Sequence, residues 1–179
     1  MEKKIAIPDG IEVSIEKDFV TARNDKNEIT KKLYYPKATF EKKGNDIIIK
    51  TKDEKRKTLS IINTWSSLVK NMFEGVTKGY RYKMKIHHVH FPMNVSVEGN
   101  KLVIKNYLGQ KEERTAKIIE GIKVQVNNEE IIIEGIDKEK VGQTAANIEK
   151  TTSLRTRRDR RIFSDGVYII SRGDDDGKK

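Results

Sequence analysis

Apolar and polar residues alternate in two stretches of the chain, at 11–15 and at 95–97. Such alternation is typical of a strand with one buried face. The first stretch follows Ile7-Pro8 and the second follows Phe91-Pro92, and a turn signal rich in charged, glycine or asparagine residues comes shortly after each. The pattern therefore predicts that each half of the chain begins with a β-hairpin.

Later motifs repeat in the same order in the two halves. The run Asn-Asp-Ile-Ile-Ile at 45–49 is echoed by Glu-Glu-Ile-Ile-Ile at 129–133, and an aspartate follows each run, Asp53 and Asp137. The offset between matching residues stays near 82 to 87. A single match means little, but a shared order along the whole chain indicates an internal duplication.

An amphipathic helix is predicted after each of these aspartates. The stronger apolar stripe has spacings of three and four residues and consists of Leu59, Ile62, Trp65, Val69 and Met72. A weaker stripe consists of Val141, Ala145 and Ile148. Asp53 and Asp137 are expected N-caps, because a short carboxylate accepts bonds from first-turn amides. Trp65 offers a base-stacking surface, but its place in the stripe favours a core position.

These elements predict an α+β fold of two tandem, duplicated domains, each an antiparallel sheet with one packed helix. We expect a last strand to close each domain, near 80–90 and near 166–171. The expected domains are 1–84 and 85–171. They are followed by a tail at 172–179, which has no apolar residue and is expected to be disordered.

The composition favours a polyanionic partner. Lys and Arg total 37 against 27 acidic residues, so the formal net charge is +10. A basic excess of this kind favours nucleic acid, because neutralised phosphates release their counterions. The chain has no cysteine, which excludes disulfides and cysteine-ligated zinc and fits a cytoplasmic protein. No apolar run is long enough to span a membrane, so no membrane partner is expected.

No catalytic constellation stands out, and we predict that the chain is not an enzyme. All three histidines lie at 87–90, where His88 and His90 would share one face of a strand and could hold a metal. Without cysteine or a nearby carboxylate, half-exposed imidazoles at a strand or junction are the favoured interpretation, so no metal or cofactor is expected. Gly75–Gly79 fits a helix end better than a phosphate loop, and Ser164-Asp165-Gly166 fits a turn.

Basic charge is concentrated at residues 150–163, the basic segment, which has six basic residues and one acid. Arginine dominates it, and the planar guanidinium binds phosphate in a bidentate manner. The predicted RNA contacts here are Lys150, Thr151, Thr152, Ser153, Arg155, Arg157, Arg158, Arg160 and Arg161. A weaker basic strip comprises Lys78, Arg81 and Lys83, with Lys85 on the same strand face as the last two. The interleaved Tyr80 and Tyr82 are expected to point inward.

Several long motifs carry a resemblance to a known family. They include Gly142-Gln-Thr-Ala-Ala-Asn147, Arg157-Arg-Asp-Arg-Arg161 and Phe163-Ser-Asp-Gly-Val-Tyr168. The central Gly75-Val-Thr-Lys-Gly-Tyr-Arg-Tyr-Lys-Met84 and His90-Phe-Pro92 belong to the same set. The chain resembles the sixth large-subunit ribosomal protein family in its archaeal and eukaryal form.

The resemblance implies a structural constituent of the large ribosomal subunit in the cytoplasm. It implies binding to large-subunit rRNA near the sarcin–ricin region, with neighbouring ribosomal proteins and translational GTPases close by. In that family the C-terminal domain carries much of the RNA contact, which would fall on residues 150–161 here. An extra-ribosomal RNA-binding protein and an enzyme acting on nucleic acid remain the alternatives.

Overall fold

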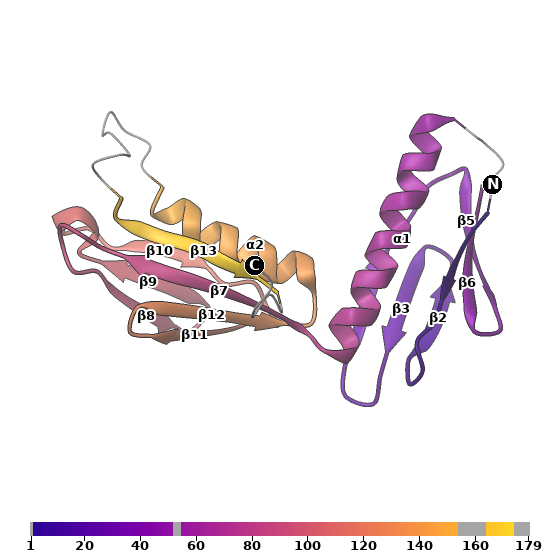
Figure 1. Cartoon of the computed structure of the whole chain (residues 1–179), viewed down its shortest axis with the longest axis horizontal. Coiled ribbons are helices and arrows are strands. Elements are labelled where there is room, and N and C mark those ends of the chain that lie inside the picture. The colour runs from indigo at the N-terminus through magenta and orange to yellow at the C-terminus, as the bar shows by residue number, and fades with distance from the viewer. Residues whose placement is uncertain (1, 52–54, 154–163, 174–179) are drawn as a thin grey trace. The chain divides into compact units, whose positions relative to one another are not determined.

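The computed structural model describes residues 2–51, 55–153 and 164–173. Contacts between residues divide the chain into two compact units, the first at Met1–Gly79 and the second at Tyr80–Lys179 (Figure 1). Each unit consists of antiparallel sheets and one α-helix, which confirms the α+β fold of two duplicated domains. Each unit has two sheets, however, rather than the single sheet that the sequence predicts.

The first unit has six strands and a helix. They are β1 (Glu2–Ala6), β2 (Glu12–Glu16), β3 (Phe19–Arg23), β4 (Glu28–Lys32), β5 (Ala38–Lys43), β6 (Asp46–Thr51) and α1 (Arg56–Thr77). One sheet has the order β1-β6-β5 and the other β2-β3-β4. Helix α1 contacts strands of both sheets, so the core of the unit lies between the helix and the sheets.

The apolar stripe of α1 faces this core, as its spacing predicts. Val69 and Met72 are fully buried, and Trp65 is 6% exposed. The indole of Trp65 stacks on the ring of Phe40, with 4.6 Å between the ring centroids. Trp65 is therefore a core residue. The helix follows Lys55, which makes no side-chain cap bond, and the predicted cap at Asp53 lies outside the described residues.

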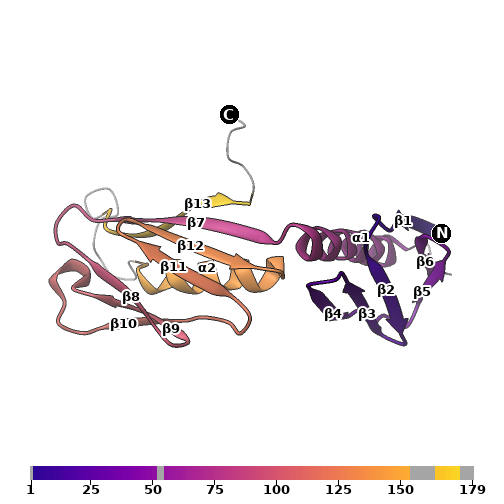
Figure 2. The same ribbon diagram turned by 90° about the horizontal axis from the view of Figure 1, so that it is seen from below.

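The second unit has seven strands, a 3-10 turn and a helix (Figure 2). They are β7 (Tyr80–His87), β8 (Asn94–Glu98), β9 (Lys101–Lys105), η1 (Tyr107–Gly109), β10 (Arg114–Lys117), β11 (Lys123–Asn127), β12 (Glu130–Gly135), α2 (Lys138–Thr151) and β13 (Gly166–Arg172). One sheet has the order β10-β9-β8 and the other β11-β12-β7-β13. Helix α2 contacts strands of both. Asp137 caps it as predicted, with Oδ1 accepting a bond of 3.0 Å from the Glu139 amide.

Strand β7 opens the second unit, whereas the sequence predicts a strand here that closes the first. It pairs with β12 and β13, and the units divide between Gly79 and Tyr80 rather than at residue 84. The duplication is plain in this arrangement, because β1-β6-β5 in the first unit corresponds to β7-β12-β11 in the second. Strand β13 has no counterpart in the described part of the first unit.

Candidate nucleic-acid interface

The basic segment is only partly described. Its five arginines, at 155–161, lie outside the described residues, as do residues 174–179 of the predicted tail. The structure does describe the residues that flank 154–163 on both sides. One side is Lys150–Ser153, at the C-terminus of α2, and the other is Ser164–Asp165, just before β13. Side chains of the second unit hold these flanking residues to each other.

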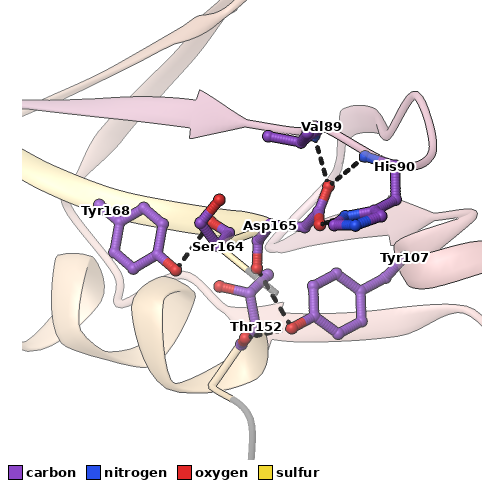
Figure 3. A network of polar contacts seen from close by, with 7 residues as sticks. All are labelled: Val89, His90, Tyr107, Thr152, Ser164, Asp165 and Tyr168. Carbon is purple, nitrogen blue, oxygen red and sulfur yellow. Dashed lines mark hydrogen bonds and ion pairs between the residues drawn. The ribbon is translucent and has the colours of Figure 1, made fainter. Parts of the chain in front are cut away.

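Thr152 joins the end of the helix to the last strand (Figure 3). Its side chain is buried, with 4% exposed. The hydroxyl Oγ1 donates to the Glu149 carbonyl at 3.1 Å and accepts from the Val167 amide at 3.0 Å. The sequence places Thr152 among the RNA contacts, but a buried hydroxyl with two internal bonds is not available to a phosphate. We therefore correct its role to that of an anchor.

Tyr107, in the 3-10 turn, forms hydrogen bonds with residues on both sides of 154–163. Its side chain is fully buried, and its hydroxyl lies 2.6 Å from the Thr152 carbonyl and 3.4 Å from the Asp165 carbonyl. The shorter contact is a strong hydrogen bond and the longer one is weak. The Tyr107 hydroxyl thus connects the residues on the two sides of 154–163 (Figure 3).

Arg114 on β10 supports the same arrangement. Its guanidinium lies over the ring of Tyr107, 4.2 Å from the centroid, and its Nη1 donates to the Thr151 carbonyl at 2.8 Å. Two further guanidinium bonds go to Oε1 of Gln110. A cation beside the last carbonyls of a helix also interacts favourably with the helix dipole. This arginine therefore serves the fold, a role that its isolated place in the sequence does not reveal.

Asp165 completes the anchor cluster, which we define as Tyr107, Arg114, Thr152 and Asp165. Its carboxyl is 1% exposed and accepts from the Val89 amide at 2.6 Å and the His90 amide at 3.1 Å. The His90 ring nitrogen Nδ1 lies 2.6 Å from Oδ2. Burial alone would raise the pKa of Asp165, but the bonds from Val89 and His90 outweigh it and lower this pKa to about 2.

The histidines therefore do have a carboxylate beside them, contrary to the sequence interpretation. It escapes notice there because Asp165 is 75 residues from His90 in the chain. Within the described residues, no three histidine, cysteine, aspartate or glutamate side chains gather in a way that could hold a metal. His87 and His88 are exposed. The favoured interpretation, a junction with partly exposed imidazoles, agrees with this arrangement.

The boundary between the two units falls within the second basic strip. Lys78 directly follows α1 and belongs to the first unit, whereas Arg81 and Lys83 lie on β7 of the second. On β7 the basic residues alternate with buried ones, and Tyr82 points inward as predicted. Nε of Arg81 lies 3.0 Å from Oε1 of Glu134, so part of this charge is neutralised within the sheet.

Comparison with known proteins agrees with the duplicated architecture. The family model described as Ribosomal protein L6 matches the chain twice, at residues 7–79 and 91–166. The chain belongs to the ribosomal protein L6 family.

Two archaeal relatives, both named "Large ribosomal subunit protein uL6", extend the match. The relative from Methanosarcina mazei is 41% identical over 170 residues, which cover 95% of this chain and 96% of that protein. The relative from Methanococcus vannielii is 37% identical over 172 residues, covering 96% of this chain and 94% of that protein. The resemblance found in the sequence is confirmed over nearly the whole chain.

Membership of the ribosomal protein L6 family makes this chain a structural protein of the cytoplasmic ribosome and not an enzyme, as predicted. The second match to the family, at 91–166, includes the anchor cluster and the five arginines. No helix in the described part of the chain is long and apolar enough to cross a membrane.

Proposed function

We propose that this chain is a structural constituent of the large ribosomal subunit and binds large-subunit rRNA through the basic segment of its second unit. The relatives from Methanosarcina mazei and Methanococcus vannielii, which carry the name of a large-subunit protein, support the assignment to that subunit. The binding site is the sarcin–ricin region, close to where translational GTPases act, with neighbouring ribosomal proteins around it. This finer location rests on the resemblance in the sequence.

The observation that carries the RNA-binding site is the anchor cluster. Tyr107 and Thr152 hold the two ends of residues 154–163 through buried hydrogen bonds. A segment with fixed ends has fewer conformations to lose when it binds, so more of its contact energy contributes to affinity. Arginines in such a segment can meet adjacent phosphates together, and each pair forms a bidentate, charge-assisted contact.

The arginines are tested by replacing four of them with alanine in the full chain and measuring rRNA affinity over a range of salt concentrations. The variant carries R157A, R158A, R160A and R161A. Each phosphate contact contributes a little less than one unit to the slope of log affinity against log salt, so this variant should flatten the slope by about two to four units. The probe is a transcript of large-subunit rRNA that includes the sarcin–ricin region.

The matched control replaces four lysines of the first unit and removes the same charge. It avoids Lys3 and Lys42, which donate internal bonds to Asn63 and to the Val13 carbonyl. The exposed set is Lys4, Lys26, Lys57 and Lys70. Equal losses of affinity in the two variants would mean that total charge decides binding and would refute the site. Co-sedimentation with large subunits separates this function from that of an extra-ribosomal RNA-binding protein.

A further inference from the structure

The four-stranded sheet of the second unit has one exposed face. On β7, Met84 and Ile86 point into the core, where the apolar side of α2 lies, so the intervening Lys85 and His87 point the other way. On the edge strand β13, Tyr168 lies on the same face as Lys85, because the two residues are directly paired. This face therefore presents an aromatic side chain beside a row of basic ones.

Tyr168 is held in one orientation although it is 43% exposed. Its hydroxyl donates to the Ser164 carbonyl at 3.0 Å (Figure 3). Its ring lies across Gly166, because a Cβ at that glycine would come within 3.1 Å of the ring atom Cζ. Glycine at 166 thus leaves the space that the ring occupies. A ring fixed in this way has little conformational freedom to lose when another planar group stacks on it.

The surrounding charge is positive on the side of β7 and β13. Lys83 and Lys85 project from β7 on this face, beside the edge strand β13. The acidic residues of the face lie on β12, where Glu134 is bound by Arg81 and Glu130 is paired with Lys85. The edge near Tyr168 is also continuous with the basic segment, because Ser164 directly follows residues 154–163.

We propose that Tyr168 is a stacking platform for an unpaired nucleotide of rRNA, with Lys85 and His87 placed beside it to bind the adjoining phosphates. This inference rests on the proposed function and extends it from the basic segment onto the sheet. Every base has a π-face that an aromatic ring can stack on, so the site does not require a particular base.

Two substitutions of Tyr168 separate its ring from its hydroxyl in the full chain. Tyr168→Leu keeps an apolar side chain above Gly166 but removes the π-face, and we expect it to weaken binding of the rRNA transcript by about 5- to 150-fold. Tyr168→Phe keeps the ring and should bind within about threefold of wild type. Because stacking involves no ion release, the salt slope should stay unchanged in both, unlike in the arginine variant. Ile170→Ala, at a neighbouring site that is 56% exposed, is the matched control and should bind normally.

Several outcomes would overturn the inference. Binding by Tyr168→Leu within threefold of wild type would exclude stacking, and an equal loss in Tyr168→Phe would assign the effect to the hydroxyl. Ultraviolet crosslinking of the unmodified chain to the same transcript gives an independent measurement, in which the crosslinked peptide should contain Tyr168; its absence refutes the contact even if a variant fails to fold. If the wild-type chain does not bind the transcript, the proposed function is refuted as well. If the arginine variant loses affinity and Tyr168→Leu does not, only this inference is refuted.

Discussion

Asp165 shows how a single carboxylate connects distant parts of the second unit. It lies just before β13, and it accepts bonds from the amides of Val89 and His90 beyond the end of β7. Because these bonds favour the charged form, the pKa falls from its ordinary value near 3.8 to about 2. A lowered pKa means that the folded protein binds the proton less tightly than the unfolded chain does.

The sign of the pH effect follows from this shift. The contribution of Asp165 to stability should be complete above about pH 4, be lost as the pH falls towards 2, and amount to about 2 kcal/mol. Asp165→Asn should therefore destabilise the protein most at neutral pH, and the gap to wild type should narrow between pH 4 and pH 2. Urea unfolding at several pH values measures both. The exposed Glu120 offers a control as Glu120→Gln, and a gap independent of pH would contradict the assigned charge effect.

At the scale of elements, the end of α2 and the start of β13 are held to each other on either side of residues 154–163. Thr152 directly follows α2, and its hydroxyl donates to the Glu149 carbonyl of the helix and accepts a hydrogen bond from the Val167 amide of β13. One hydroxyl therefore connects the end of the helix to the start of the strand. Tyr107 adds its bond to the Thr152 carbonyl from a turn that lies between β9 and β10. The stability of the second unit therefore depends in part on a few hydrogen bonds that lie next to the segment proposed to bind RNA.

Thr152→Val tests whether this hydroxyl anchors the fold or contacts RNA. The variant leaves the buried Val167 amide without its acceptor, which should cost about 1–3 kcal/mol in the free energy of unfolding. The salt slope of rRNA binding should remain that of wild type, because no phosphate contact is lost. Thr64→Val, whose exposed hydroxyl donates to the Ser60 carbonyl within α1 of the first unit, is the control. Unchanged stability together with weaker binding would restore Thr152 to the RNA contacts.

The sequence reveals elements whose signals are local. The stripe of Trp65, Val69 and Met72 predicts α1 because helical spacing lies within a few turns of chain, and Asp137 predicts the start of α2 for the same reason. The sequence analysis places the strand at 80–90 in the first unit, because the pattern of a strand does not show which strands it pairs with. The partners of β7 are β12 and β13, which lie beyond residue 129. Contacts such as His90 with Asp165 depend on that pairing and cannot be read from spacing.

At the scale of the whole molecule, the observed boundary changes the charge balance. Residues 1–79 carry 17 basic and 12 acidic residues, and residues 80–179 carry 20 and 15, so each unit has a net charge of +5. Bulk charge therefore favours neither unit as the RNA-binding one. Any preference of rRNA for one unit must come from how the charges are placed, because scattered charges are screened over about 8–10 Å at physiological salt.

The two units provide a direct comparison of placement at equal charge. Each has its own buried core, so residues 1–79 and 80–179 should each unfold cooperatively when produced separately. We expect 80–179 to retain most of the salt slope of the full chain for the rRNA transcript, and 1–79 to bind more weakly. Urea unfolding checks that each piece is folded before its affinity is measured. Equal affinity of the two units would contradict the assignment of RNA binding to the second.

The position of β13 has a consequence for the order of events during synthesis. Tyr168 pairs with Lys85, so about eighty further residues must be synthesised after β7 before β13 can pair with it. Contacts between residues so far apart in the chain form slowly, whereas α1 and its sheets are made earlier and can fold first. The arginines at 155–161 leave the synthesising ribosome before residues 166–172 do. The bond from the Val167 amide to Thr152, which holds the C-terminal side of the segment proposed to bind rRNA, can therefore form only after β13 has been made. We expect the chain to become able to bind rRNA through this segment only when its last strand is complete.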